Sequence, residues 1–386
     1  MIRTTSSLRS LCYNHPIVVP HSLNRIFTCC AMGLALSLSA CGASTEQTMR
    51  VVDHHPQPVP VKTAPRLHPA NGYSVVQRVT GDYAGYPDLN LFIEKMVRVH
   101  GFERNYLYGI FSQAQRKDWT LNYLAKSDDT AKSGPSPGGW TRYRAKFLDE
   151  RHISDGVEFA YSYRTALRRA YLRYGVPEEY ILGILAVETI FGGNVGNHRV
   201  LDALTTLSFD YARRGQYFQE ELEDFLLMTR REGIDPTEPV GSFAGAMGLG
   251  QFMPSSFLKY AVDFNGDGRR NLWDPEDAIG SIANYFVQHG WRSGQPVVTP
   301  LATRGTVSLE PGIDKQYTIA ELEQAGLHAK YSGNPDSTVN LLLLRHTDHD
   351  QYLIGYPNFY TITRYNHSTY YAMAVHEVAQ AIKQQL

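Results

Sequence analysis

The segment that most constrains the fold is PEEYILGILAVETIFGG, residues 177–193, which has the pattern of one helix. A proline suits its first turn, and two consecutive glycines near its end favour a stop. Ile181, Ile184 and Leu185 have the spacing of one apolar face, at positions i, i+3 and i+4. The next position of that face, i+7, is Glu188. The sequence therefore predicts a carboxylate that points into the protein interior.

A carboxylate among Ile and Leu side chains loses the hydration of its charged form, so its pKa rises. Glu188 could then stay protonated near neutral pH and donate a proton, which is the requirement for a general acid. The same position also suits a structural carboxylate that pairs with an arginine. The pattern of this helix leaves both interpretations open.

The composition excludes some partners and leaves others open. The chain has 386 residues, which is long enough for two or three packed units. Its 37 basic and 38 acidic residues nearly cancel, so we expect no nucleic-acid partner and no electrostatically held membrane partner. Its 25 tyrosines suit a carbohydrate ligand, because phenol rings stack on apolar faces and hydrogen-bond at the rim, but they suit an ordinary core equally well.

The first 40 residues have the pattern of an export signal. Three arginines precede the apolar run 26–40, which is too short to span a bilayer. The run ends in LSACG, residues 38–42, which resembles the bacterial lipobox, whose cysteine becomes the lipidated first residue of the mature chain. An ordinary secretory signal is the alternative. Because glycine after Cys41 resembles lipoproteins sorted to the outer membrane, we expect a periplasmic protein anchored there through Cys41.

The remaining chain divides by composition and period. Residues 41–86 are polar and rich in proline, which is typical of a tether. Helical periods fill residues 87–175. They also occur in residues 176–294, where the glycine-rich stretch 241–256 and the loop 263–269 interrupt them. Residues 295–360 change to short apolar runs typical of strands, and residues 361–386 return to a final helix that we expect to pack back on the core. We predict an α+β fold that is mainly helical, with a helical N-terminal domain and a small β-rich insert.

Apolar spacing and capping residues predict the individual elements. Asp88 is a candidate N-cap of the first helix, and Ser154 begins a later helix that continues to Gly175. Thr318 and Glu321 have the spacing of a capping box. The other predicted helices are 102–115, one long helix after a turn within 201–231, 275–289 and 369–384, and the predicted strands are 306–309, 339–344 and 352–354.

Five segments occur in order between residues 85 and 386. They are AVET (186–189), ALTTLSFDYARR (203–214), GSFAGAMGLGQFMPSS (241–256), DFNGDGRRNLWDPEDA (263–278) and NFYTITRYNHSTYYAMAV (358–375). This ordered set resembles the membrane-bound lytic murein transglycosylase B family, which has a lysozyme-like catalytic core. The resemblance implies cleavage of the β-1,4 bond between N-acetylmuramic acid and N-acetylglucosamine in peptidoglycan. It also implies that no water is used and that a 1,6-anhydro end is left.

The resemblance assigns residues as well. The family's single catalytic acid/base matches Glu188, and no cofactor for catalysis is implied. Positions of the family's saccharide groove match Ser242, Gln251, Tyr365, Asn366 and Tyr371, and further groove positions match Tyr143, Arg213, Arg214 and Tyr285. Peptidoglycan strands are the implied partner, with other cell-wall enzymes as further candidates. The segment after Glu188 departs from the family's bulkier and more basic version, which affects sugar preference rather than the reaction.

A loop within the fourth segment has the pattern of a calcium site. DFNGDGR, residues 263–269, matches D-x-[DN]-x-[DN]-G of an EF-hand. The twelfth position is Asp274, whereas the resemblance implies a lengthened loop closed by a later carboxylate. The expected ligands are Asp263, Asn265, Asp267, the carbonyl of Arg269 and, by the resemblance, Asp277. An Asx-rich turn held by its own hydrogen bonds is the alternative.

Two other functions stay open at this point. One is a hydrolytic muramidase that uses the same acid but admits water, and the other is a catalytically inactive, peptidoglycan-binding scaffold lipoprotein. Asp202 and Asp210 follow in the next segment, but neither stands out as a second catalytic acid. There is no HExxH pattern, so we expect no catalytic zinc. A P-loop is excluded because the glycine-rich stretch 241–256 lacks GK[ST].

Overall fold

The computed structural model describes residues 76–130, 136–303, 307–329 and 337–386. The predicted export signal, the lipidation site at Cys41 and most of the predicted tether lie outside these residues. Val79 and Tyr83 belong to the stretch predicted as tether, but both are buried in the core. The hydroxyl groups of Tyr83 and Thr206 are hydrogen-bonded at 3.0 Å, so the packed part of the chain begins before residue 86. Among the described residues, no helix has the length and apolar character needed to cross a membrane.

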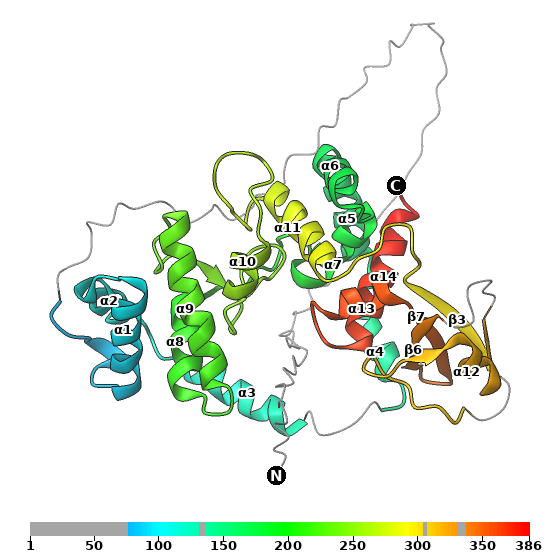
Figure 1. The fold of residues 1–386 in the computed structure, drawn as a ribbon, viewed down its shortest axis with the longest axis horizontal. Coiled ribbons are helices and arrows are strands. Elements are labelled where there is room, and N and C mark those ends of the chain that lie inside the picture. Colours follow the sequence, from blue (N-terminus) through cyan, green and yellow to red (C-terminus); the bar gives the residue numbers. More distant parts are fainter. Residues whose placement is uncertain (1–75, 131–135, 304–306, 330–336) are drawn as a thin grey trace, which may run out of the picture.

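The described chain is mainly helical, as predicted (Figure 1). The helices up to the Glu188 segment are α1 (Pro87–His100), α2 (Arg104–Phe111), α3 (Asp118–Thr130), α4 (Gly139–Arg144), α5 (Glu150–Ser162), α6 (Arg164–Tyr174) and α7 (Glu178–Thr189). The later helices are α8 (Val200–Asp210), α9 (Gly215–Glu232), α10 (Pro254–Tyr260), α11 (Pro275–Gln288), α12 (Ile319–Gln324), α13 (Pro357–Thr363) and α14 (Thr369–Lys383).

Several predicted helix ends were wrong. Tyr86 is the N-cap of α1, so Asp88 lies within the first turn. The helix predicted from Ser154 to Gly175 is two helices, because Tyr163 leaves the helical conformation between α5 and α6. α5 also starts earlier, with the carboxylate of Asp149 as its N-cap acceptor. The segment 201–231 likewise holds two helices, α8 and α9, instead of one long helix after a turn.

The small sheet has five antiparallel strands in the order β4-β6-β7-β3-β5. The strands are β3 (Val298–Thr303), β4 (Tyr317–Thr318), β5 (Leu327–Ala329), β6 (Thr338–Arg345) and β7 (Asp350–Gly355), and a separate ribbon pairs β1 (His198–Arg199) with β2 (Val240–Gly241). β6 and β7 match predicted strands, and the predicted capping box of Thr318 and Glu321 starts α12. β3 was missed, and the described part of the predicted strand 306–309 is not a strand.

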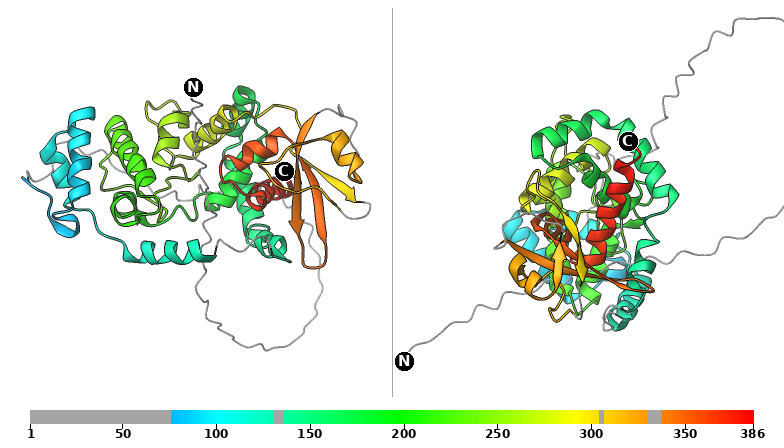
Figure 2. Two further views of the ribbon diagram at one scale, coloured as in Figure 1. Left: turned by 60° about the horizontal axis from the view of Figure 1, so that its bottom comes forward. Right: turned by 90° about the vertical axis from the view of Figure 1, so that its right-hand side faces the viewer.

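The C-terminal helix α14 packs against α7 in the middle of the molecule. α7 is buried almost all round, from Tyr180 to Ala186. Gly183 allows α14 to approach closely, because a Cβ at that position would lie 2.6 Å from the carbonyl oxygen of Val375. α14 also lies next to α5 and β6, so it joins the helical core to the sheet (Figure 2). The last element of the chain therefore supports the helix that carries Glu188.

Candidate active site

Glu188 lies in the last turn of α7, directly before an unusual stretch of backbone. α7 ends at Thr189, because Ile190 and Phe191 both have left-handed backbone angles, with φ of 50° and 53°. This conformation is unfavourable for bulky residues and is most often retained next to functional groups. The predicted stop at the glycines that follow was wrong for this reason, since the helix ends before them.

Thr189 fastens the glycine-rich segment, residues 241–256, to the end of α7. Its buried hydroxyl donates a hydrogen bond to the carbonyl of Leu249 at 2.9 Å and accepts one from the N–H of Gly192 at 3.1 Å. The glycine-rich segment is therefore held beside Glu188. Thr189 was not predicted as a site residue, although a threonine directly after an inward-facing glutamate could have indicated it.

The carboxyl group of Glu188 is surrounded by protein yet is partly accessible. Burial raises its pKa to about 7, although a hydrogen bond from Tyr371 lowers the pKa and so offsets part of this shift. The hydroxyl of Tyr371 donates that hydrogen bond to Oε1 over 2.5 Å. Glu188 can therefore hold a proton near neutral pH and act as a proton donor.

Three further tyrosines lie within electrostatic reach of Glu188. Tyr143 of α4, Tyr285 of α11 and Tyr365, which follows α13, each have a raised pKa. Burial is the main cause for each, and the charge of Glu188 adds to it. The rings of Tyr285 and Tyr365 lie 4.6 Å apart. These phenols stay neutral, so the surroundings of Glu188 offer apolar faces and hydrogen bonds without charge.

No second carboxylate acts on Glu188 within the described residues, to judge from the groups that shift its pKa. Asp202 is buried and forms ion pairs with Lys117 at 3.0 Å and Arg199 at 2.6 Å. Asp210 accepts a hydrogen bond from a tyrosine hydroxyl at 3.2 Å. Both acids that follow in sequence are therefore engaged elsewhere, and neither is placed to serve as a base for water at Glu188.

The glycine-rich segment folds into tight turns beside Tyr365. A Cβ at Gly250 would lie 3.2 Å from the hydroxyl of Tyr365, which shows how closely the backbone approaches. Gln251 has a left-handed φ of 50°, and its side-chain amide donates to a carbonyl of the same turn at 2.9 Å. Ser242 Oγ accepts a hydrogen bond from a backbone N–H of the turn at 3.0 Å. The structure thus places Gly250 and Phe252, the two neighbours of Gln251, against Tyr365, with Ser242 in the same set of turns.

Three buried polar atoms in the C-terminal part of the site have no hydrogen-bond partner in the part of the chain that the structure describes. They are the hydroxyl oxygens of Tyr365 and Tyr370 and Oδ1 of Asn366. Leaving such a group unpaired costs about 1–3 kcal/mol, so each could accept a partner from a ligand. The ring of Tyr370 lies 5.9 Å from that of Tyr143. Tyr370 was missed from sequence, although the tyrosine pair in STYY could have indicated it.

Arg213 and Arg214 are not brought to Glu188. They lie between α8 and α9, where the guanidinium of Arg214 covers the ring of Tyr217 at 4.3 Å. Arg213 is exposed. Neither arginine contributes to the pKa shift of Glu188, so any contact with a ligand lies beyond the immediate surroundings of that carboxyl group.

The predicted calcium loop is held by hydrogen bonds from its own backbone. Asp263 accepts from the N–H groups of Gly266 at 2.7 Å and Gly268 at 2.9 Å. Asn265 and Asp267 each accept from the N–H two residues further on, at 2.9 Å. These are the hydrogen bonds of an Asx-rich turn, and they leave other lone pairs of the same oxygens for a cation.

Asp277 closes the loop from beneath. It is fully buried and accepts from the N–H groups of Phe264 at 2.7 Å and Asn271 at 2.8 Å. Burial raises its pKa to about 6 in spite of these hydrogen bonds. Asp274, at the twelfth position, is instead the N-cap of α11. Among the described residues no three His, Cys, Asp or Glu side chains converge on one point, but the oxygen donors of this loop suit a hard cation.

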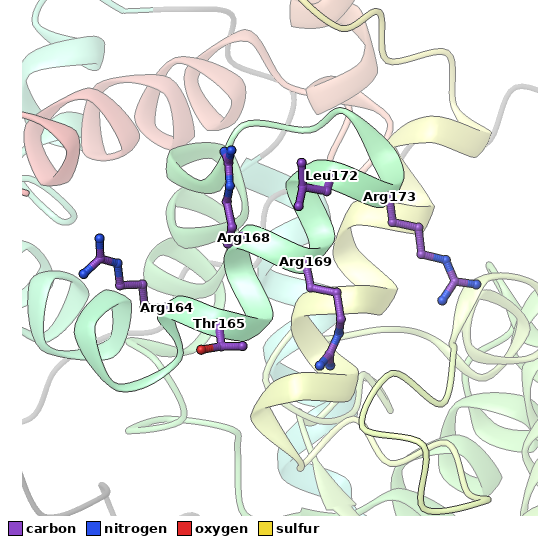
Figure 3. Close-up of a pocket in the computed structure, with 6 residues that line it drawn as sticks. All are labelled: Arg164, Thr165, Arg168, Arg169, Leu172 and Arg173. Carbon is purple, nitrogen blue, oxygen red and sulfur yellow. The ribbon is translucent and has the colours of Figure 1, made fainter.

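A basic surface lies on one face of α6 (Figure 3), and Glu188 is not among the residues that line it. The depression there is lined by residues of α6 alone, namely Arg164, Thr165, Arg168, Arg169, Leu172 and Arg173. Arg169 donates to Glu276 and to the carbonyl of Phe264, each at 2.7 Å, so it also supports the loop 263–277. A surface formed by one helix face does not enclose a substrate.

The chain belongs to a known class of glycan-cleaving enzymes. Residues 86–380 match the family described as Transglycosylase SLT domain, so the class is that of the lytic transglycosylases. The chain is 50% identical over 311 residues to Membrane-bound lytic murein transglycosylase B of Escherichia coli strain K12, which covers 80% of this chain and 86% of that protein. It is a member of the membrane-bound lytic murein transglycosylase B family.

Solved structures agree with this assignment. The 2.1 Å structure of the Escherichia coli lytic transglycosylase Slt35 in complex with calcium has a TM-score of 0.75 and 48% identity, over 83% of this chain and 99% of that one. SltB3 from Pseudomonas aeruginosa in complex with NAG-anhNAM-pentapeptide has a TM-score of 0.67 and 25% identity, over 77% of this chain and 79% of that one. The family, the lysozyme-like fold and the transglycosylase function predicted from sequence are confirmed, in preference to a muramidase or an inactive scaffold.

Proposed function

We propose that Glu188 is the only acid/base of this transglycosylase, acting on the β-1,4 bond between N-acetylmuramic acid and N-acetylglucosamine. The isolation of Glu188 is the observation that supports this proposal. Its pKa is near 7, and no second carboxylate of the described chain acts on it. Glycoside hydrolases need a second carboxylate. It lies about 6.5–9.5 Å from the acid in inverting enzymes and about 5–5.5 Å from it in retaining enzymes.

The reaction can then proceed in two proton transfers. Protonated Glu188 gives its proton to the glycosidic oxygen as the bond to C1 of muramic acid breaks, and the N-acetyl oxygen of that sugar stabilises C1. Ionised Glu188 then accepts the proton of the C6 hydroxyl as the C6 oxygen bonds to C1. No water enters, and the carboxylic acid is restored. The C6 hydroxyl competes well with water for C1, because it is tethered to the reacting sugar.

Tyr371 supports the ionised form of Glu188 between these transfers, because its hydroxyl already donates to Oε1. We further propose that Ser242, Gln251, Tyr365 and Asn366 contact the sugars. The unpaired atoms of Tyr365 and Asn366 support this role, since the hydroxyl and N-acetyl groups of a glycan would pair with them. The other proposed groove residues are Tyr143 and Tyr285 near Glu188 and Arg213 and Arg214 further away. The glycan fragment bound by the related SltB3 is consistent with this substrate class.

The product tests the proposal. Purified protein is incubated with sacculi, and the released muropeptides are analysed by mass spectrometry with and without borohydride. We expect fragments that are lighter by one water and resist borohydride, because a 1,6-anhydro end has no free aldehyde. If borohydride reduces the new muramic acid ends, water was the nucleophile and the proposal fails.

We propose that the loop 263–277 binds calcium as a structural ion. The side chains of Asp263, Asn265, Asp267 and Asp277 and the carbonyl of Arg269 would hold it. Calcium would supply positive charge that draws these oxygens together, and carboxylate, amide and carbonyl oxygens are the ligands that this hard cation prefers. The calcium complex of the related Slt35 supports the proposal.

We also propose the setting in which the enzyme acts. Cys41 carries the lipid anchor, and the residues between Cys41 and the buried Val79 form the tether. The catalytic part then works in the periplasm, held at the outer membrane. The name of the related membrane-bound enzyme is consistent with such an anchor. The division at residues 87, 176, 295 and 361 is a proposal of the same kind, as are other cell-wall enzymes as partners.

A further inference from the structure

Four aromatic rings form a cluster, here called the aromatic surface, that no proposed role accounts for. Trp119 at the start of α3 is 55% exposed, which is unusual for the largest apolar side chain. Its ring is stacked with Tyr123 at 5.2 Å and with His198 at 5.7 Å. The edge of buried Phe243 meets the rings of Trp119 and Tyr123 at 5.8 Å and 5.0 Å. Phe243 therefore supports the cluster from the buried side, while more than half of the surface of Trp119 stays exposed beside its two stacking partners.

The charges around the aromatic surface are internally paired. Lys117 and Arg199 both form ion pairs with buried Asp202, at 3.0 Å and 2.6 Å. Burial and the charge of Lys117 lower the pKa of His198, so its ring is neutral at pH 7. These groups therefore offer little charge for an ion pair with a ligand. A neutral ligand with a broad apolar face and polar edges fits better, and a pyranose ring has that character.

The aromatic surface continues the proposed wall of the glycan site. Phe243 follows Ser242 directly in the glycine-rich segment. His198 pairs with Gly241 in the β1–β2 ribbon, and Gln251 donates to the carbonyl of Val195 at 3.3 Å. The β1–β2 ribbon and the glycine-rich segment thus connect the surroundings of Glu188 to the aromatic surface. α3 itself runs along one side of the molecule from α1 and α2 toward α4 (Figures 1 and 2).

We propose that the aromatic surface binds one sugar ring of the same glycan strand, outside the two sugars joined by the scissile bond. The apolar face of the sugar lies on the indole of Trp119, with Tyr123 and His198 extending the contact. The inference rests on the proposed function, because it assumes a polymeric glycan as substrate. It would give longer strands an advantage over fragments that end at the scissile bond.

Sedimentation of the protein with insoluble sacculi tests this, with Glu188→Gln as the parent so that the polymer is not degraded. We expect Trp119→Ala to weaken binding by roughly 3- to 10-fold, the range for one aromatic contact. Trp119→Tyr keeps a ring and should restore most of the affinity. Tyr161→Ala is the matched control, because Tyr161 is 58% exposed on α5 and belongs to no proposed site.

The outcomes separate this inference from the proposed function. If Trp119→Ala binds sacculi like its parent, or if Tyr161→Ala weakens binding equally, the aromatic surface is not a subsite, while the product test is unaffected. If Trp119→Tyr is as weak as Trp119→Ala, stacking is not the cause and the inference is wrong. If the parent itself does not bind sacculi, the glycan assignment fails and the inference fails with it.

Discussion

At the residue scale, the proposed catalysis depends on a carboxyl group that is buried enough to hold a proton and still partly accessible to the substrate. The tyrosines around Glu188 do this without charge, so burial is not countered by a nearby cation. An arginine in the same place would hold the carboxylate ionised and remove the proton donor. The structural ion pair considered for Glu188 from sequence is therefore absent among the described residues, and a hydrogen bond from Tyr371 takes its place.

Glu188→Gln tests the proton donor directly. The amide keeps the shape but cannot exchange a proton, so we expect release of muropeptides from sacculi to fall by about 10²–10⁴-fold. Glu221→Gln is the matched control, because Glu221 is also buried with a raised pKa but is bonded to Ser255. That variant should keep its turnover. Near-normal activity of Glu188→Gln would disprove the mechanism.

The same substitution should change stability in a pH-dependent way. The pKa of Glu188 is raised from 4.5 to about 7 by folding, so its favourable contribution is full below pH 4.5 and is lost as the pH rises through about 7. Glutamine does not ionise, so the variant does not lose this stability as the pH rises. The melting temperature of Glu188→Gln should therefore exceed that of the wild type by more at pH 8 than at pH 4.

Tyr371→Phe should move the pH profile of activity. The hydrogen bond from Tyr371 lowers the pKa of Glu188, so its removal raises that pKa above about 7. The loss of activity at the alkaline side should then occur at higher pH, together with a lower maximum rate. Tyr161→Phe, which removes an exposed hydroxyl on α5, should leave the profile in place. An alkaline limb that stays or moves to lower pH would contradict this account of Glu188.

At the element scale, the calcium loop offers the clearest measurement. Calcium that binds only the folded state adds about 2.7 kcal/mol at a hundredfold excess over its Kd. EDTA should therefore lower the melting temperature, and added calcium should restore it. The double variant Asp263→Ala, Asp267→Ala should not respond, whereas Asp348→Ala, at an exposed turn between β6 and β7, should respond like the wild type. If neither EDTA nor calcium changes the melting temperature of the wild type, the calcium site is ruled out.

Elements set by local chemistry could be predicted from sequence, and those set by distant contacts could not. The capping box of Thr318 and Glu321 needs only its own four residues. Ile190 has a left-handed backbone conformation that isoleucine disfavours, so contacts with the surrounding structure must hold it there. Inward-facing Glu188 followed from one helical period, but its hydrogen bond to Tyr371 spans 183 residues. The family resemblance supplied Tyr371, since no local pattern could.

At the scale of the whole molecule, two hydrophobic cores meet at β6, which contributes Leu342 and Leu344 to the larger core and Leu341 to the smaller one. The larger core holds α7 and α14, and a small one under the sheet includes Leu322, Leu327 and Leu341. α14 lies against α7 and also contacts β6. Stability of the Glu188 helix is therefore coupled to a segment at the other end of the chain.

Gly183→Ala tests this coupling. The new methyl group would meet the carbonyl oxygen of Val375 at 2.6 Å and must push α14 away, so we expect a loss of about 1–3 kcal/mol in the free energy of unfolding. Gly312→Ala is the control, because no atom lies within 4 Å of its added Cβ, and it should change stability by less than about 0.5 kcal/mol. Equal melting temperatures for both variants would show that α14 is not closely packed on α7.

The span of 183 residues between Glu188 and Tyr371 has a consequence for when the enzyme becomes active. A ribosome makes the N-terminal end first, and domains fold as units once their parts are present. A nascent chain can form α7 long before it contains Tyr371, but its catalytic centre is still incomplete. The proposed acid/base therefore gains the hydrogen bond from Tyr371 only after the final helix has been made and has packed on α7, so a chain that ends before α14 lacks part of its proposed site.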